Sequence, residues 1–227
     1  MRYYYIVAAA GIGKRMRLDY PKQFLEYKGK PIFITTVEEI EKNSKVTDII
    51  IVTNKDYIKE VKEMIKKYRL KKVKEIVAGG KERQDSIYNG LKLIDDNDSI
   101  VGIQDGVRPF IKQNYIDEGY KKLNKNSTIS GVVVGVKVKD TIKEIDKNKN
   151  IVNTPKREKL IAAQTPQIFR TQILKKAYES AFENDYYGTD DSSLMEYIGE
   201  KIEIIEGNYN NIKITTPEDL VFLKQKE

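Results

Sequence analysis

Short apolar runs that alternate with longer amphipathic stretches constrain this chain most strongly. Each run is rich in β-branched residues and nearly continuous in apolar side chains, which is typical of a strand buried on both faces of a parallel sheet. Each amphipathic stretch is long enough to bring the chain back as a helix in a right-handed crossover. The pattern therefore predicts an α/β fold with a mostly parallel, doubly wound sheet. The four pairs are YYYIVAA (3–9) with PIFITTVEEIEKN (31–43), DIIIVTN (48–54) with DYIKEVKEMIKKY (56–68), KVKEIVAG (72–79) with RQDSIYNGLKLI (83–94), and SIVGIQDG (99–106) with QNYIDEGYKKLN (113–124).

The second half of the chain departs from this alternation. After a fifth run, TISGVVVGVKV (128–138), the segments TIKEI and IVNTP alternate in polarity around the turn-like DKNKN. Neither segment has an apolar stripe, so we expect a polar hairpin at about 138–159 that projects from the sheet and needs a partner surface. Since there is no internal repeat or linker, residues 1–227 are expected to form one domain. Further elements are expected as helices at about 171–184 and 192–198, strands at 201–207 and 211–215, and a closing helix at 217–225.

The composition excludes several kinds of chemistry. The 227 residues include no cysteine and no histidine, so disulfides, thiolate nucleophiles, zinc clusters and histidine-based acid–base catalysis are absent. Catalysis must use Lys, Arg, Asp, Thr, backbone amides and a metal ion held by oxygen. The formal charge of +7 suits small phosphorylated ligands, but the lysines are interleaved with acidic residues, so no nucleic-acid partner is expected. The N-terminal apolar run is too short for a signal peptide or a membrane span, which predicts a cytoplasmic protein.

The loop after the first run, AAAGIGKRM, lies where a ligand binds in an open α/β sheet, at the carboxyl end of a strand. A dinucleotide fingerprint requires a third glycine, and the chain has Met16 there. A Walker A loop requires Ser or Thr after Gly13-Lys14, and the chain has Arg15. Both standard motifs are therefore excluded.

What remains is a loop of small residues, 8–13, followed closely by Lys14, Arg15 and Lys22. Its backbone amides can approach phosphates or a base edge, and the cations can neutralise a triphosphate. The alternative is a simple strand-to-helix connection with surface lysines.

The loop after the third run, AGGKERQDS, contains Gly79 and Gly80 and then opens a helix with Arg83 and Ser86. The paired glycines permit close backbone approach to a flat base, and the Ser86 hydroxyl can reach a sugar hydroxyl or a base edge. Taken alone, the same pair of glycines is also compatible with an ordinary turn.

The loop after the fourth run, IQDGVRPF, places Asp105 at the end of a strand and Arg108 three residues later. A carboxylate there commonly binds a metal ion or sugar hydroxyls, and a nearby arginine commonly binds phosphate. An Asp–Arg pair that only ties the loop together is equally compatible with this pattern.

Seven stretches taken together, AAAGIGKRM…PKQ, GGKERQDS, DGVRP, KDT, QTPQIF, TDDSS and GNYNNIKITTPEDL, resemble the 2-C-methyl-D-erythritol 4-phosphate cytidylyltransferase family in order and spacing from Ala8 to Leu220. The resemblance implies a Rossmann-like sheet with helices on both faces and a β-arm that interlocks two subunits of a homodimer. It also implies the transfer of a cytidylyl group from CTP to 2-C-methyl-D-erythritol 4-phosphate in the non-mevalonate isoprenoid pathway. The cofactor implied is Mg²⁺ or another divalent cation, held mainly by the CTP phosphates.

The same resemblance implies roles for individual residues. The catalytic residues would be Arg15, Lys22 and Lys213. The CTP-binding residues would be Ala9, Ala10, Gly11, Gly13, Lys14, Gly80, Ser86 and Asp105. The residues that contact the sugar phosphate would be Asp105, Arg108, Thr141, Arg157, Thr165, Thr189 and Lys213, of which Thr141 and Arg157 lie on the arm and would reach the neighbouring subunit's site.

The chain departs from the family's pattern in the fourth loop, which bears on the acceptor, and at Lys81. The fourth loop reads Asp-Gly-Val-Arg where the family more often has Asp-Ala-Ala-Arg, and with Phe110 it also resembles the ribitol-5-phosphate cytidylyltransferases. That related activity is the alternative function. The stretch TDDSSLMEY instead favours the methylerythritol enzymes. Lys81 occupies a position where an acidic residue is frequent.

Overall fold

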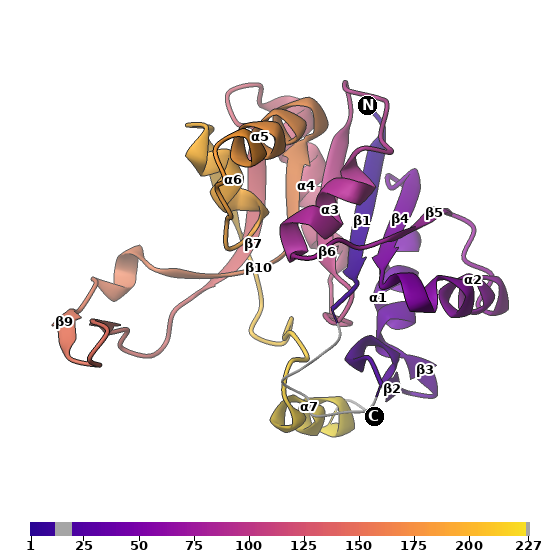
Figure 1. The fold of residues 1–227 in the computed structure, drawn as a ribbon, viewed down its shortest axis with the longest axis horizontal. Coiled ribbons are helices and arrows are strands. Elements are labelled where there is room, and N and C mark those ends of the chain that lie inside the picture. The colour runs from indigo at the N-terminus through magenta and orange to yellow at the C-terminus, as the bar shows by residue number, and fades with distance from the viewer. Residues whose placement is uncertain (12–19, 226–227) are drawn as a thin grey trace.

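The computed structural model describes residues 1–11 and 20–225 (Figure 1). Most of the expected helices and strands are present within two or three residues of the expected bounds. In chain order, with η marking a 3-10 helix, the elements are β1 (Tyr3–Ala9), η2 (Lys22–Phe24), β2 (Glu26–Tyr27), β3 (Lys30–Pro31), α1 (Ile32–Glu41), β4 (Asp48–Thr53), η3 (Lys55–Tyr57), α2 (Ile58–Lys67), β5 (Val73–Ala78), α3 (Arg83–Leu91), β6 (Ile100–Asp105), α4 (Gln113–Lys125), β7 (Gly131–Lys137), β8 (Glu144–Ile145), β9 (Ile151–Asn153), η4 (Arg157–Lys159), β10 (Ile161–Arg170), α5 (Thr171–Glu183), α6 (Asp191–Tyr197), β11 (Ile202–Glu206), η5 (Pro217–Asp219) and α7 (Leu220–Gln225).

The central sheet has seven strands in the order β11-β7-β10-β6-β1-β4-β5. Strand β10 pairs antiparallel with both β6 and β7, while the other paired neighbours are parallel. The register aligns Ala8 of β1 with Asp105 of β6, and Ala9 with Thr53 of β4. The carboxyl ends of these three strands therefore meet at one edge of the sheet, and the expected mostly parallel α/β fold is confirmed.

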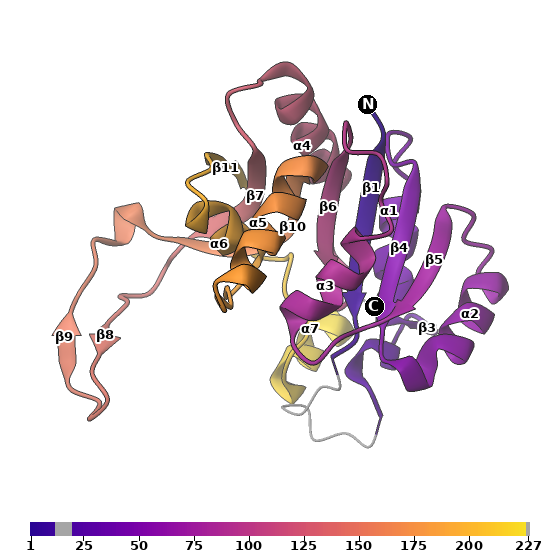
Figure 2. The same cartoon turned by 45° about the horizontal axis from the view of Figure 1, so that its top comes forward.

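Helices cover both faces of the sheet, as β1 illustrates. Tyr3, Tyr5 and Val7 point to one face and pack in a core with apolar side chains of α1, α2 and α4. Tyr4 and Ile6 point to the other face and pack with α3, α5 and α6. This alternation follows from the two-residue period of a strand, and burial of both sets explains why the first run is almost entirely apolar. Figure 2 shows α3 and α5 in front of the sheet, with α4 and α1 behind it.

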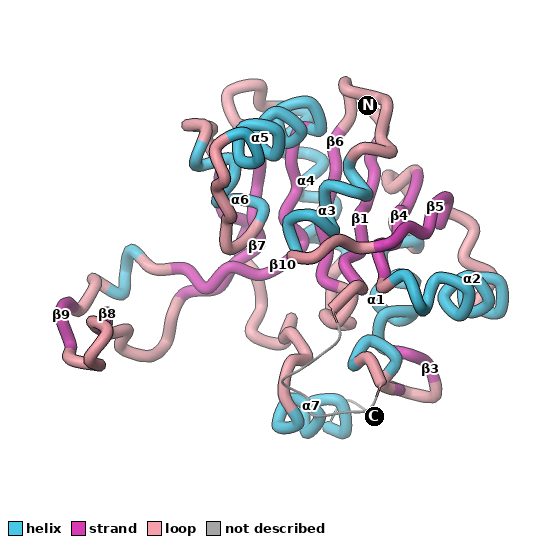
Figure 3. Tube along the Cα trace, in the orientation of Figure 1, coloured by secondary structure: helices cyan, strands magenta, loops and turns pink. Residues whose placement is uncertain are grey.

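A long hairpin projects from the sheet between β7 and β10 (Figures 1 and 3). We call residues 138–159 the arm. Near its tip, β8 pairs with β9 around a turn in which the Asp146 amide donates to the Asn150 carbonyl oxygen over 3.0 Å. The Asp146 carboxylate accepts from the amides of Asn148 and Asn150, both at 2.8 Å. The hairpin expected from TIKEI, DKNKN and IVNTP is therefore confirmed.

The strand expected at 211–215 is wrong. That segment is irregular, and the Ile214 amide donates to the Val107 carbonyl oxygen over 2.9 Å, outside the sheet. The alternation of Ile212 and Ile214 arises because both pack in a small third core with Val107 and α7. None of the helices within residues 1–11 and 20–225 is long and apolar enough to span a bilayer.

Candidate active site

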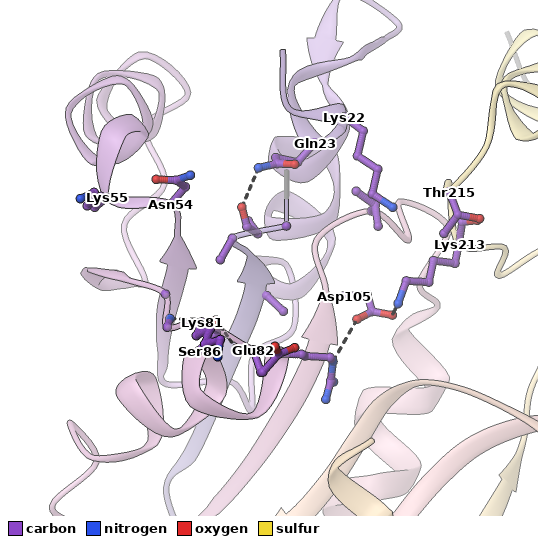
Figure 4. Close-up of a pocket in the computed structure, with 18 residues that line it drawn as sticks. Lys22, Gln23, Asn54, Lys55, Lys81, Glu82, Ser86, Asp105, Lys213 and Thr215 are labelled. Carbon is purple, nitrogen blue, oxygen red and sulfur yellow. Dashed lines mark hydrogen bonds and ion pairs between the residues drawn. The ribbon is translucent and has the colours of Figure 1, made fainter. Parts of the chain in front are cut away.

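A cavity of about 590 Å³ opens at the carboxyl ends of β1, β4, β5 and β6 (Figure 4). The first, third and fourth loops contribute to it as expected from the topology of the sheet. The loop after β4 also contributes, through Asn54 and Lys55, and sequence reasoning missed it. The described residues that line the cavity are Ala8, Ala9, Ala10, Gly11, Lys22, Gln23, Asn54, Lys55, Gly79, Gly80, Lys81, Glu82, Arg83, Ser86, Asp105, Val107, Lys213 and Thr215.

Small residues bring the first and third loops into contact and form one wall of the cavity. A Cβ atom on Gly79 would lie 2.6 Å from the Ala10 Cβ, so only glycine allows this approach. The Gly80 amide donates to the Ser86 hydroxyl over 3.0 Å, and that hydroxyl donates to the Glu82 carbonyl oxygen over 2.9 Å. Ser86 thus fixes the loop and keeps one acceptor lone pair for a further partner.

Gln23 ties the first loop to η2. Its side chain is 2% exposed, and its Nε2 donates to the Ala9 carbonyl oxygen over 2.7 Å. Lys22, the preceding residue of the same short helix, lines the cavity, and Figure 4 shows it on the same side as Lys213. The sequence signal for Gln23 was its place in the PKQ that follows the loop.

Asp105 lies among three cations. Its Oδ2 is 2.8 Å from Lys213 Nζ and 3.4 Å from Arg108 Nε, and its Oδ1 is 3.9 Å from Arg83 Nε. Burial alone would raise the pKa of Asp105, but the three cations outweigh it and lower the pKa to about 2. Burial lowers the pKa of Arg108, although Asp105 opposes that effect. Asp105 is therefore ionised throughout the neutral range.

Buried polar groups outside the cavity lining fix Asp105 and Arg108 through hydrogen bonds. The Asp105 amide donates to the Thr165 hydroxyl over 3.2 Å, and Thr165 is itself buried. Arg108 Nη1 donates to the Asn211 carbonyl oxygen over 2.7 Å, and Asn211 Nδ2 donates to the Thr165 carbonyl oxygen over 2.9 Å. The fourth loop, β10 and the segment before Lys213 are therefore joined in one hydrogen-bonded network.

The structure brings together many of the predicted site residues. Those that line the cavity are Ala9, Ala10, Gly11, Lys22, Gly80, Ser86, Asp105 and Lys213. Arg108 and Thr165 lie beside Asp105 and contact it directly. Thr189 is exposed on the loop before α6, and Thr141 and Arg157 are exposed on the arm, where Arg157 Nη1 donates to the Lys139 carbonyl oxygen. Gly13, Lys14 and Arg15 lie outside the described residues.

The cavity offers few oxygen ligands of its own to a metal ion. Within the described part of the chain, no group of three or more acidic side chains is placed to hold one. Glu82 and Asp105 are the acidic residues among those that line the cavity. Mg²⁺ commonly binds through one or two carboxylates together with substrate phosphates. The donor set therefore fits a cation that arrives with a phosphorylated ligand.

A backbone-lined wall facing a cationic polar side, at the open edge of an α/β sheet, suits a nucleotide and its phosphates, and together with the family match it makes this an enzyme of the nucleotidyltransferase class. The chain belongs to the 2-C-methyl-D-erythritol 4-phosphate cytidylyltransferase family, whose profile matches residues 3–225. Relatives of that name include one from Fusobacterium nucleatum, 51% identical over 97% of this chain and 94% of its own length. Another, from Clostridioides difficile, is 46% identical over 98% of this chain and 92% of its own length.

Solved structures agree with this membership. The 4-diphosphocytidyl-2C-methyl-D-erythritol synthase of Anaerococcus prevotii superposes with a TM-score of 0.86 at 32% identity, covering 99% of this chain and 95% of that one. The 2-C-methyl-D-erythritol 4-phosphate cytidylyltransferase of Francisella tularensis gives 0.83 at 29% identity, covering both chains completely. The expected resemblance and the expected activity, cytidylyl transfer from CTP to methylerythritol phosphate, are confirmed. The ribitol-5-phosphate alternative is not favoured.

Proposed function

We propose that the cavity binds CTP and the acceptor sugar phosphate side by side and transfers the cytidylyl group between them. The observation that carries this proposal is the division of the cavity into a wall of small residues and a polar side with Lys22, Asp105 and Lys213. The alanines and glycines of the wall leave room for a flat base and a ribose beside the longer side chains of Lys81 and Glu82, while the cations face the triphosphate. The residues that take the nucleoside in this arrangement are Ala9, Ala10, Gly11, Gly80, Ser86 and Asp105. Gly13 and Lys14, which lie outside the described residues, are assigned to CTP by the family resemblance.

The transfer needs no general base. A phosphate oxygen of the acceptor, already an anion at neutral pH, attacks the α-phosphorus of CTP and forms a new P–O bond. The bond between the α-phosphorus and the bridging oxygen breaks, and pyrophosphate leaves with the electron pair. Charge develops on the oxygens of the α-phosphoryl group, and Lys22 and Lys213, with Arg15, stabilise it. Positioning and electrostatics supply the catalysis, which agrees with a chain that lacks histidine and cysteine.

Enzymes of this class generally use a divalent cation, and we propose Mg²⁺ held mainly by the triphosphate. Asp105 would be the protein's oxygen donor, since its carboxylate is ionised and lines the cavity. The cation, when bound, neutralises phosphate charge and improves pyrophosphate as a leaving group. The role of this chain's own residues is to hold the phosphates beside Lys22 and Lys213.

The acceptor lies on the side of the cavity next to Thr165 of β10 and the loop before α6. Arg108 and Lys213 pair with its phosphate, and Asp105, Thr165 and Thr189 contact its hydroxyls or position the groups that do. Arg108 is mostly buried and its guanidinium is fixed by the Asn211 carbonyl oxygen, so it offers a preorganised cation.

We further propose that residues 1–227 form one domain and act as a homodimer, in which each arm reaches the neighbouring subunit's site with Thr141 and Arg157. The arm supports this proposal because its tip is two short strands that expose large apolar side chains and have no core of their own. These side chains, 59–63% exposed, are Ile145, Ile151 and Val152. The cytoplasmic location and the absence of nucleic-acid and membrane partners stay predictions.

The activity is tested by pyrophosphate release with CTP, Mg²⁺ and each acceptor in turn. We expect turnover with methylerythritol phosphate and little with ribitol 5-phosphate, and the reverse result would refute the proposed acceptor. Lys213→Met should lower kcat by about a hundredfold or more, because it removes a cation from the reacting phosphates. Lys59→Met, an exposed lysine of α2, is the matched control and should behave as the unsubstituted protein.

The crossing of the arms is tested by mixing two inactive proteins, Lys213→Met and Arg157→Ala. In a mixed dimer, one site combines an intact Lys213 with an intact arm from the other subunit. Random mixing should therefore restore about a quarter of the full activity, because half the dimers are mixed and each has one intact site. No recovery after subunit exchange would refute the crossed arrangement.

A further inference from the structure

We propose that Asp191 and Tyr178 are positioning residues for the transfer reaction and that they act through Arg83 on Asp105. This inference rests on the proposed function, since it takes Asp105 as a group of the active cavity. It gives a role to the second aspartate of the TDDSS stretch, which is absent from the described lining of the cavity.

Arg83 bridges two carboxylates. It is the first residue of α3, lines the cavity, and leaves 34% of its side chain exposed. Its Nη2 lies 2.6 Å from Asp191 Oδ2, while its Nε lies 3.9 Å from Asp105 Oδ1. The shorter contact is to the carboxylate outside the cavity, so Asp191 sets the position of the guanidinium, and the Nε of the same group faces Asp105.

The surroundings of Asp191 fix its carboxylate next to the guanidinium of Arg83. It lies in the first turn of α6 and is 0% exposed. Tyr178 of α5 is also fully buried, and its hydroxyl donates to Asp191 Oδ1 over 2.5 Å. One carboxylate oxygen is thus committed to Tyr178 and the other to Arg83. A buried carboxylate is costly unless it is paired and hydrogen-bonded, and this geometry supplies both.

The electrostatics agree with the geometry. Burial tends to lower the pKa of Arg83, but Asp191 and then Asp105 outweigh burial and raise it. Burial and the charge of Asp191 raise the pKa of Tyr178, which keeps its hydroxyl protonated as a donor. Arg83 therefore stays charged, and the Tyr178 hydroxyl stays a donor, over the whole pH range in which the enzyme is assayed.

The consequence for the cavity is a fixed carboxylate. Arg83 faces Oδ1 of Asp105, while Lys213 and Arg108 face Oδ2. Without the charge of Asp191, Arg83 loses its shortest ion pair and is drawn toward Asp105, where it competes with Lys213 for the carboxylate. Lys213 is then displaced from the position that we assign beside the reacting phosphates.

Asp191→Asn keeps the size of the side chain and removes its charge. We expect kcat to fall about ten- to hundredfold with a smaller change in KM for either substrate, as when one hydrogen bond to a charged group is lost. Tyr178→Phe removes only the hydroxyl and should lower kcat by less than about tenfold. Tyr178→Phe also tests the inference if Asp191→Asn does not fold.

A double-mutant cycle with Arg83→Gln separates positioning from a merely structural role. If Asp191 acts through Arg83, the combined variant is no slower than Arg83→Gln alone, because the two changes interrupt one path. Leu194→Ala, at a buried apolar position of the same helix α6, is the control for lost stability and should retain kcat at temperatures where it is folded.

Two results would overturn the inference: a kcat of Asp191→Asn and Tyr178→Phe equal to that of Leu194→Ala, or effects of Asp191→Asn and Arg83→Gln that multiply. Failure of the proposed function has a different signature. In that case Asp105→Asn and Arg83→Gln themselves keep full turnover, whereas failure of this inference alone leaves those two variants impaired and Asp191→Asn active.

Discussion

Asp105 is a buried anion among three cations, and replacing it with asparagine should destabilise the protein in a pH-dependent way. The difference between its pKa of about 2 and the ordinary value of 3.8 corresponds to about 2 kcal/mol of unfolding free energy at neutral pH. Asparagine keeps the volume but leaves Lys213, Arg108 and Arg83 close together without the anion. We therefore expect Asp105→Asn to unfold about 2 kcal/mol more easily at pH 7.

The pH dependence follows from the direction of the shift. The pKa is lower in the folded state than in the unfolded state, so the stabilisation is complete above about pH 5 and is lost as the pH falls toward 2. The advantage of the unsubstituted protein over Asp105→Asn should shrink to about 1 kcal/mol at pH 3. Urea unfolding followed by circular dichroism at pH 7, 5, 4 and 3 measures this difference in unfolding free energy between the two proteins. Asp95→Asn, at an exposed site, is the control. If the difference in unfolding free energy between the two proteins stays constant from pH 7 to 3, the assignment of these cations to an ionised Asp105 is contradicted.

Three further substitutions test the walls of the cavity. Lys22→Ala should lower kcat by about a hundredfold in steady-state assays, and a change confined to the KM for CTP would count against its role on the reacting phosphates. Gln23→Leu removes the donor to the Ala9 carbonyl oxygen and should cost about 1 kcal/mol in urea unfolding, so unchanged stability would show that this bond contributes nothing. Gly79→Ala places a methyl group 2.6 Å from the Ala10 Cβ and should raise the KM for CTP about tenfold by moving the two loops apart, which an unaltered KM would disprove.

Local patterns predicted the parts of this molecule that depend on neighbours in the sequence. The apolar runs and amphipathic stretches predicted most of the helices and strands, although not β10, because burial on one or both faces imposes a period that is visible along the chain. Asp105 was found because it ends such a run. The strand expected at 211–215 failed for the same reason, since Ile212 and Ile214 alternate while packing beneath α7 rather than within the sheet.

Contacts between distant segments could not be predicted in this way. Arg83 and Asp191 are 108 positions apart, and nothing near either residue indicates that they pair. The hydrogen bond from Arg108 to the Asn211 carbonyl oxygen could not be predicted either, since every residue has a backbone carbonyl and the residue type does not show which one accepts. The residues of the site were named by resemblance, and the network that orients them required the fold.

The wall of small residues also determines how this enzyme can change under selection by an inhibitor. A compound that packs against the wall meets backbone and methyl groups, so substitutions there can add atoms but have almost none to remove. At Gly79 and Gly80 an added Cβ would collide with the protein itself, at 2.6 Å and 2.3 Å from neighbouring Cβ atoms. At Gly11 an added Cβ would meet nothing within 4 Å among residues 1–11 and 20–225. Escape variants selected against such a compound should therefore arise at Gly11 rather than at the glycine pair.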